Sequence, residues 1–304
     1  MPAPMITPEI EPRLDWRELI AALENGHRAP KAEIADSFLY RGGDTLLSRA
    51  AWIDGMGALV KTATIFPGNP AQHLPSVNGG VSLFSDSDGC LEALVDFHLV
   101  TKWKTAGDSL LAASKLARPN SRRITLVGAG TVARSMHAAY RTLFPEARFT
   151  IWNRSASGAE TFARDLPDTE AETDLESAVR EADIICTATM STEPLIRGAW
   201  LQAGQHLDLI GAYRPDMREV DDEALRRASI FVDSRETTVE HIGELKIPIS
   251  RGVISAADIV ADFYDMESGL FTRQDDASIT IAKNGGGAHL DLMTSRYIFD
   301  RWRD

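Results

Sequence analysis

The stretch from Arg123 to Tyr140 constrains the fold of this chain more than any other segment. A short apolar run at 124–127 is followed by Gly128, Gly130 and Ala133, in the spacing G-x-G-x-x-A, and then by a helix-like pattern. In a strand–turn–helix unit of this kind, the first glycine permits the tight turn and the second lets a pyrophosphate approach the backbone. The small third residue lets the helix pack closely on the strand, and the helix N-terminus faces the phosphates. The segment therefore predicts the start of a dinucleotide-binding unit.

Strand and helix patterns alternate after this fingerprint, which is typical of a doubly wound parallel sheet. The later strands are expected at 149–153, 183–187, 206–210, 230–233 and 278–283. Before the fingerprint, a helix at 14–27 precedes short β-like runs at 37–40, 45–52, 58–65, 81–84 and 91–96. Strand runs so close together, with turn residues between them, predict an antiparallel meander. The predicted fold class is α/β: a Rossmann-type nucleotide domain preceded by an α+β domain with an antiparallel sheet.

We expect two domains in the 304 residues. The first comprises residues 1–117 together with a C-terminal helix within 285–304 that folds back on it, and the Rossmann domain comprises 118–284. A helix expected at 101–116 lies at the boundary, where a substrate is expected to meet a cofactor.

Composition excludes several classes of function. The net charge of −12, without a Lys/Arg cluster, argues against a nucleic-acid-binding protein. No apolar run approaches the ~18 residues of a membrane span, and no signal peptide is recognised, so we expect a cytoplasmic protein without a membrane partner. Cys90 and Cys186 are expected to be reduced and buried. The histidines show no zinc-binding spacing and no G-x-S-x-G motif occurs, so neither a metal site nor a serine hydrolase is predicted.

The end of the second nucleotide-domain strand reads Asn153-Arg154-Ser155. NAD sites usually carry an acidic residue there, which binds the ribose hydroxyls. An arginine and a hydroxyl suit the 2′-phosphate of NADP instead. NADP(H) is therefore the preferred cofactor and NAD(H) the alternative. The competing interpretation is that Arg154 is a solvated loop cation.

Three cations of the first domain interrupt apolar patterns: Arg49, Lys61 and Lys104. Each alone is most simply a solvent-facing residue, but together in one pocket they would hold a carboxylate, and a lysine there can donate a proton. Strand alternation places Lys61 on the same face as Leu59 and Ala63. A buried ammonium on that face must meet water or an anion, and we expect the substrate carboxylate to be this anion.

Several segments together resemble one known family over nearly the whole chain. They are V-K-T-A-T-I-F-P-G-N from Val60, V-T-K-W-K-T-A from Val100, G-A-G-T-V-A, W-N-R-S, G-A-Y-R-P-D-M-R-E from Gly211 and A-K-N-G-G-G-A-H-L-D from Ala282. In their order and spacing they resemble the ornithine cyclodeaminase/mu-crystallin family.

The resemblance implies a homodimer in which the first domains pair. It also implies that Lys61 contacts the substrate and acts in catalysis, and that Lys104 replaces an arginine that binds the substrate carboxylate. Asn284 matches a residue at the nicotinamide end of the cofactor. The complete set of expected cofactor-binding residues is Thr105, Gly128, Gly130, Thr131, Val132, Asn153, Arg154, Ser155, Thr187, Ala188, Gly211 and Asn284.

One departure from the family pattern selects among its activities. Cyclodeaminases carry an aspartate where this chain has Tyr213, and the surrounding R-P-D-x-R-E is similar to the reductase members. The expected activity is therefore NAD(P)H-dependent reduction of 1-pyrroline-2-carboxylate or 1-piperideine-2-carboxylate. Ornithine cyclodeamination or amino-acid dehydrogenation is the first alternative. An NADPH-binding, crystallin-like protein without turnover is the second.

Overall fold

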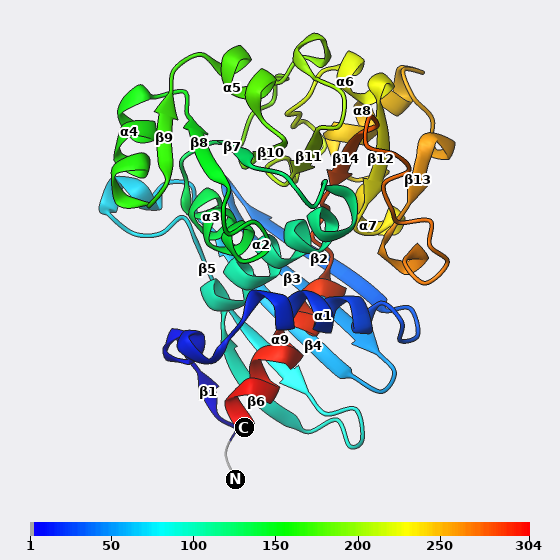
Figure 1. The fold of residues 1–304 in the computed structure, drawn as a ribbon. Coiled ribbons are helices and arrows are strands. Elements are labelled where there is room, and N and C mark those ends of the chain that lie inside the picture. Colours follow the sequence, from blue (N-terminus) through cyan, green and yellow to red (C-terminus); the bar gives the residue numbers. More distant parts are fainter. Residues whose placement is uncertain (1–2) are drawn as a thin grey trace. The chain divides into compact units, whose positions relative to one another are not determined.

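The computed structural model describes residues 3–304, which form two compact units (Figure 1). Unit 1 runs to Lys104 and resumes at Gly287–Asp304, and unit 2 is Thr105–Gly286. The helix α2 (Phe97–Leu116) is continuous across the first boundary. The sequence predicts this boundary after residue 117, just beyond the end of α2, because a helix end is visible in a sequence and a change of packing partners within a helix is not.

Unit 1 is built on a six-stranded sheet in the order β1-β6-β5-β4-β3-β2. Its strands are β1 (Met5–Ile6), β2 (Glu33–Arg41), β3 (Asp44–Ile53), β4 (Gly57–Ile65), β5 (Val77–Phe84) and β6 (Leu91–Asp96). The pairs from β2 to β6 are antiparallel, and β1 adds to β6 in parallel. The predicted meander is therefore confirmed, with strands longer than the apolar runs because polar residues continue the pairing.

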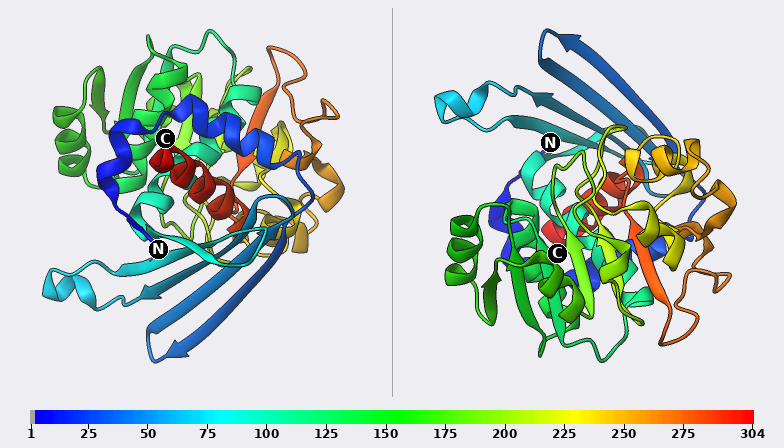
Figure 2. Two further views of the ribbon diagram at one scale, coloured as in Figure 1. Left: turned by 90° about the horizontal axis from the view of Figure 1, so that it is seen from below. Right: turned by 90° about the horizontal axis from the view of Figure 1, so that it is seen from above.

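The helix α9 (Ala288–Arg303) packs on one face of this sheet, and α1 (Trp16–Gly26) packs against α9 (Figure 2). Asp15 caps α1 by accepting the N–H groups of Arg17 and Glu18. The helix α9 is buried along most of its length against α1 and the central strands. The C-terminal helix thus belongs to the first unit. Short 3-10 helices lie at Pro8–Arg13 and Asn69–Gln72.

Unit 2 contains an eight-stranded, entirely parallel sheet in the order β13-β12-β14-β11-β10-β7-β8-β9. Its strands are β7 (Arg123–Val127), β8 (Arg148–Trp152), β9 (Thr169–Glu172), β10 (Ile184–Thr187), β11 (His206–Leu209), β12 (Ala228–Val232), β13 (Ile259–Ala261) and β14 (Ile279–Lys283). Strand order reverses at β7, which lies between β8 and β10, as a doubly wound sheet requires. The predicted fold class is confirmed.

The helices of unit 2 are α3 (Thr131–Leu143), α4 (Ala156–Asp165), α5 (Leu175–Glu181), α6 (Asp222–Arg227), α7 (Arg235–Thr238) and α8 (Gly243–Ser250). Three further 3-10 helices lie at Gly198–Trp200, Ala256–Asp258 and Phe263–Asp265. The central strands are buried on both faces, so they read as continuous apolar runs such as Ile184–Thr187. The sequence did not predict β9, because its residues Thr169–Glu172 are polar and it lies at the sheet edge.

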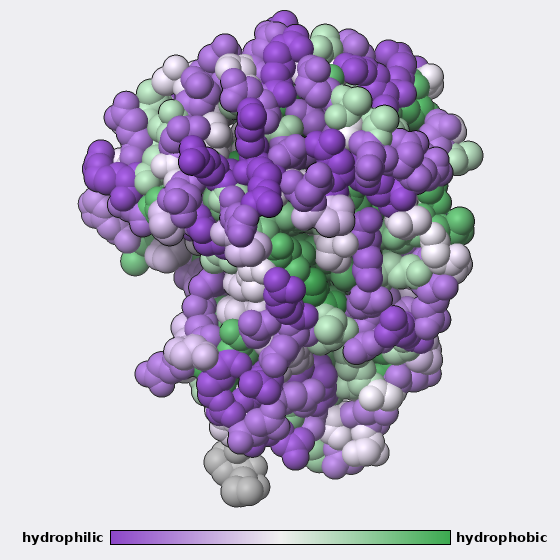
Figure 3. Space-filling view, viewed as in Figure 1, coloured by the Kyte–Doolittle hydropathy of each residue, from purple (hydrophilic) through white to green (hydrophobic). Residues whose placement is uncertain are grey.

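The surface is polar and one cysteine lies on it. The face seen in Figure 3 is mainly hydrophilic, in keeping with the net charge of −12. Cys186 is buried, but Cys90 is exposed, so the expectation that both are buried was wrong for Cys90. Cys90 lies in the Ser85–Cys90 turn, whose backbone closes on itself and leaves the thiol in solvent. Within residues 3–304, no helix is both long and apolar enough to cross a membrane.

Candidate active site

Charged residues face one another across neighbouring strands of the sheet in unit 1. In the β2–β3–β4 register, Arg49 lies opposite Asp36 on one side and Lys61 on the other. Arg49 forms an ion pair with Asp36 at 2.7 Å. Two cations directly opposite each other repel, so the Arg49–Lys61 pair requires a further anion near it.

That anion is Asp291, on the first turn of α9. Its Oδ1 accepts a hydrogen bond from Lys61 Nζ at 2.8 Å, and its Oδ2 lies 3.8 Å from Arg49 Nη1. Both Asp291 and Lys61 are buried, at 0% and 6% exposure. An ion pair taken out of water is retained only when its geometry and further hydrogen bonds offset the loss of hydration.

The first turns of α2 complete the surroundings of Lys61. Its Nζ donates to the Thr101 hydroxyl at 2.9 Å and lies 4.7 Å from the centre of the Phe97 ring. Lys104 follows three residues after Thr101, on the same side of the helix. It is also buried, and its charge acts on both Lys61 and Asp291.

We call Arg49, Lys61 and Lys104 the cation cluster. Burial, helped by the positive charge of Lys104, lowers the pKa of Lys61 to about 8, while the charge of Asp291 opposes this change. Burial alone would raise the pKa of Asp291, but the charges of the cation cluster hold it below its ordinary value. Asp291 is therefore ionised, and Lys61 is poised to give up a proton near neutral pH.

The structure brings together the three cations that the sequence singled out, and it supplies a residue that the sequence analysis missed. The alternation of Leu59, Lys61 and Ala63 onto one buried face is confirmed. The sequence led us to expect the substrate carboxylate as the anion beside Lys61, and the structure places a carboxylate of the chain itself, Asp291, in that position. Asp291 was visible as the last residue of A-K-N-G-G-G-A-H-L-D, but it lies 230 positions from Lys61.

In unit 2, the fingerprint forms a tight turn between β7 and α3. Gly128 has a φ of +106°, and a Cβ there would lie 2.7 Å from the Ala188 carbonyl oxygen, so only glycine fits. Gly130 is the N-cap residue of α3, and a Cβ on it would meet nothing within 4 Å. No side chain caps this end of α3. Open space in front of an uncapped helix N-terminus, at Thr131 and Val132, fits the phosphates of a dinucleotide.

The end of β8 carries no acidic side chain directed at the βα turn. Asn153 Oδ1 accepts the Ala129 N–H at 3.3 Å, and the Ser155 hydroxyl caps α4 by accepting the Gly158 N–H at 3.3 Å. Arg154 is exposed. The position adjoining the fingerprint turn therefore presents an amide, a guanidinium and a hydroxyl.

The remaining expected cofactor residues lie at strand ends, apart from Thr105, which is half-buried on α2. Thr187 ends β10, and the Ala188 N–H donates to Val127 O at the end of β7. Gly211 follows β11. Asn284 follows β14, is 4% exposed, and its Oδ1 accepts no hydrogen bond from the described residues. A buried amide oxygen in this position suits a polar ligand group such as a carboxamide.

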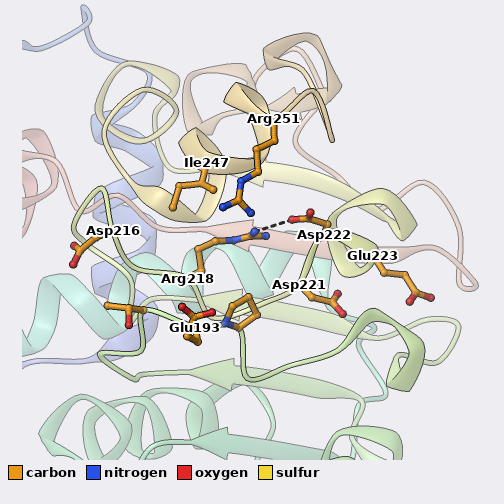
Figure 4. Close-up of a pocket in the computed structure, with 10 residues that line it drawn as sticks. Glu193, Asp216, Arg218, Asp221, Asp222, Glu223, Ile247 and Arg251 are labelled. Carbon is orange, nitrogen blue, oxygen red and sulfur yellow. Dashed lines mark hydrogen bonds and ion pairs between the residues drawn. The ribbon is translucent and has the colours of Figure 1, made fainter.

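A pocket of about 800 Å³ in unit 2 lies elsewhere (Figure 4). It is lined by Thr192, Glu193, Pro194, Asp216, Arg218, Asp221, Asp222, Glu223, Ile247 and Arg251. Five of these ten residues are acidic, and the buried Arg218 is paired with Asp222 at 2.7 Å. None of the expected site residues lines it, and its acidic lining disfavours an anionic dinucleotide. In residues 3–304, no group of three His, Cys, Asp or Glu side chains is arranged to hold a metal ion.

Comparison with known families gives a match over residues 51–304 to the model described as the ornithine cyclodeaminase/mu-crystallin family. The chain belongs to this family. The family prediction from the sequence motifs is therefore confirmed.

Within the family, relatives named as imine reductases align over most of the chain. The Delta(1)-pyrroline-2-carboxylate reductase of Paracoccus denitrificans is 49% identical over 94% of this chain and 92% of its own length. The ketimine reductase mu-crystallin of Mus musculus is 34% identical over 80% of this chain and 75% of its own. Among solved structures, an archaeal alanine dehydrogenase dimer with bound NAD is 28% identical. It has a TM-score of 0.90 and covers 98% of this chain and 95% of that one.

The Lys61–Asp291 pair predicts that losing only the carboxylate destabilises the protein more than losing both charges. Asp291→Asn leaves the buried cation cluster without its carboxylate, so we expect the free energy of unfolding to fall by about 3 kcal/mol. The double variant Lys61→Met/Asp291→Asn should recover part of this loss, because it no longer buries an unpaired ammonium. Urea denaturation at neutral pH measures both.

Asp36→Asn is the matched control for this prediction. Asp36 also pairs with Arg49, but its side chain is 31% exposed, so its loss should cost less than about 1 kcal/mol. Equal losses for Asp36→Asn and Asp291→Asn would contradict the assignment of Asp291 as the central counter-ion.

Proposed function

We propose that this chain reduces a cyclic imine 2-carboxylate, 1-pyrroline-2-carboxylate or 1-piperideine-2-carboxylate, to proline or pipecolate with NAD(P)H. The observation that carries the proposal is the buried Lys61–Asp291 pair within the cation cluster. The relatives named as Delta(1)-pyrroline-2-carboxylate and ketimine reductases carry out the kind of reaction expected from the sequence. The prediction of an oxidoreductase acting on a C=N bond agrees with them.

The cation cluster suits a substrate carboxylate. It places three positive charges around the buried carboxylate of Asp291, and Arg49 also pairs with Asp36. Arg49 offers a planar guanidinium, and Lys104 a compact ammonium that lacks the bidentate geometry of arginine. We assign these two side chains to binding the carboxylate, which fixes the orientation of the imine.

Lys61 is the proposed proton donor. Reduction of C=N adds a hydride to carbon and a proton to nitrogen, and the bound cofactor supplies the hydride. Lys61 Nζ donates a proton to the imine nitrogen and recovers one from water. Asp291 and Thr101 orient the ammonium through their hydrogen bonds. A pKa of about 8 keeps Lys61 mainly protonated at neutral pH and makes the transfer easier than from an ordinary lysine.

Cyclodeamination of ornithine is the alternative reaction. Where cyclodeaminases are expected to carry a carboxylate base, this chain has Tyr213, which is 57% exposed. A phenol in solvent is a poor general base at neutral pH, so we favour the reductase. Release of ammonia from ornithine with catalytic NAD would favour the alternative. An NADPH-binding protein without turnover is the remaining alternative, and absence of any imine-dependent NADPH oxidation would favour it.

We further propose that the cofactor is NADPH in preference to NADH. The support is the exposed Arg154 at the end of β8, next to the Ser155 hydroxyl and without an acidic residue in that segment. The NAD-bound alanine dehydrogenase shows that NAD is used by at least one protein of similar structure.

We also propose that two chains pair through the sheet of unit 1. The edge strand β2 is exposed along nearly its whole length, and its outer part carries Phe38, Leu39 and Tyr40, which are 47%, 64% and 74% exposed. An exposed apolar edge strand is a site for pairing with another chain. The dimeric alanine dehydrogenase supports a second copy as the occupant. The cytoplasmic location stays a prediction.

The proton-donor assignment predicts a pH profile. With NADPH and either imine, the loss of absorbance at 340 nm should show kcat/KM constant below pH 8 and falling above it, because Lys61 with a pKa of about 8 loses its proton there. Lys61→Met should lower kcat/KM at least ~100-fold and remove this limb. Lys102→Met is the control, since Lys102 pairs with Glu11 outside the cation cluster. No oxidation of NADPH with either imine would refute the proposed reaction, and an unchanged limb in Lys61→Met would refute the donor.

The cofactor proposal predicts that removing Arg154 weakens the binding of NADPH but not that of NADH. Arg154→Ala should weaken NADPH binding by about ten- to a hundredfold, since a charge-assisted hydrogen bond is worth about 1.5–3 kcal/mol. NADH binding should stay nearly constant. Equal losses for the two cofactors, measured by fluorescence titration, would show that Arg154 does not read the 2′-phosphate.

The pairing proposal predicts that Leu39→Glu yields monomers in sedimentation velocity, because it places a charge on the apolar edge. Leu270→Glu is the control, since Leu270 is similarly exposed (54%) but lies in unit 2. A monomeric parent protein, or a Leu39→Glu variant that remains dimeric, would contradict it.

A further inference from the structure

A buried carboxylate joins the loops that follow β10 and β11. Glu219 is 0% exposed. Its Oε1 accepts the N–H and the hydroxyl of Thr189 at 2.9 and 2.7 Å. Its Oε2 accepts the N–H groups of Gly211 at 2.8 Å and Ala212 at 3.2 Å. The two carboxylate oxygens therefore accept four hydrogen bonds in all, and this one side chain holds the two loops at a fixed separation.

A second buried carboxylate fixes the turn after β14. Asp233 directly follows β12, and its Oδ2 accepts the N–H groups of Gly285 and Gly286 at 2.9 and 2.6 Å. Its Oδ1 accepts the Thr238 hydroxyl at 2.6 Å. The packing is close, because a Cβ on Gly285 would lie 2.1 Å from the Thr238 hydroxyl oxygen. Asn284, with its buried Oδ1, is the residue immediately before this turn.

Lys283 connects the two carboxylate sites. It ends β14 and is 0% exposed, and its Nζ donates to Leu209 O at 2.7 Å and Asn284 O at 2.6 Å. Burial lowers the pKa of Lys283, while the carboxylates of Glu219, Glu244 and Asp233 oppose this change. The ammonium thus supplies the positive charge among the buried carboxylates and ties the end of β11 to the end of β14.

The network formed by Glu219, Asp233 and Lys283 differs in its position from the apolar side chains that usually fill a protein core. Buried charges are costly, and apolar side chains of similar size often stabilise a fold as well or better. Here the charged groups lie at the carboxyl ends of the adjacent parallel strands β10, β11, β14 and β12, on the side of β7 away from β8. In doubly wound sheets a dinucleotide lies across the carboxyl ends, so one half lies over β8 and the other over this side.

We propose that Glu219 and Asp233 are positioning residues that hold the loops after β10, β11 and β14 in the arrangement that receives the nicotinamide half of the cofactor. This inference rests on the proposed use of NAD(P)H. It assigns these two residues no contact with the substrate and no proton transfer. Their role is to fix the backbone at Thr189, Gly211 and Gly285.

The test compares NADPH with 2′-phospho-ADP-ribose, which lacks the nicotinamide. In Glu219→Gln the amide must turn its NH2 group toward either Thr189 or Gly211, so one loop loses its acceptor. Asp233→Asn does the same to the turn at Gly285. Each variant should bind NADPH at least about tenfold more weakly, and 2′-phospho-ADP-ribose within about twofold of the parent protein.

Asp183→Asn is the matched control. The Asp183 carboxylate likewise accepts two backbone N–H groups, those of Arg122 and Arg123, but it lies at the amino end of β10. Its substitution should leave the ratio of the two affinities unchanged even if it lowers stability. Circular dichroism of each variant establishes that it is folded, and Asp233→Asn provides the result if Glu219→Gln does not fold.

The outcomes separate this inference from the proposed function. Equal weakening of both ligands, or no weakening of either, in folded variants would overturn the positioning role while leaving NADPH binding by the parent protein intact. Failure of the parent protein to bind any nicotinamide dinucleotide would instead overturn the proposed function.

Discussion

The buried ion pair between Lys61 and Asp291 connects the two ends of the chain in unit 1. Lys61 lies in the middle of the antiparallel sheet, and Asp291 lies on the helix that returns from the far end of the sequence. Without this carboxylate, Lys61 would lose its buried counter-ion, and Arg49, opposite it across β3 and β4, would keep the ion pair with Asp36. In the proposed reaction the same pair sets the chemistry, because the charge of Asp291 favours the ionised form of Lys61 while burial lowers its pKa.

In unit 2, buried carboxylates have a different role, because they accept hydrogen bonds from backbone N–H groups. The loops that follow parallel strands contain backbone N–H groups that form no hydrogen bonds within a helix or a strand. A ligand site at these loops must leave room for the ligand. Glu219 and Asp233 accept hydrogen bonds from several of these donors, and so fix the loops. At the other half of the sheet, the turn at Gly128 depends on the positive φ of glycine and on the Asn153 side chain, which accepts the Ala129 N–H.

Both proposed ligands, the substrate and the cofactor, are anions, and the two units provide different kinds of positive groups for them. In the proposed reaction, the cation cluster of unit 1 binds a small carboxylate. In unit 2, the N-terminus of α3 and Arg154 are the groups proposed to bind the phosphates, while the buried carboxylates of Glu219 and Asp233 accept backbone N–H groups. This division explains why the overall charge of −12 is compatible with anionic ligands. Local fields at a few positions decide binding, and the net charge does not.

The sequence by itself determined the fold class, the fingerprint turn and most strands, because glycine spacing and apolar periodicity are local signals. It also identified Lys61 as unusual, since a charged residue interrupting an apolar strand is visible locally. It could not identify Asp291 as the partner of Lys61 or Glu219 as the acceptor for Thr189 and Gly211. Lys61 and Asp291 lie 230 positions apart, and Glu219 meets Thr189 from 30 positions away, so only tertiary packing decides which groups these buried charges meet. The boundary within α2 was hidden for the same reason, because a continuous helix gives no local sign of where its packing partners change.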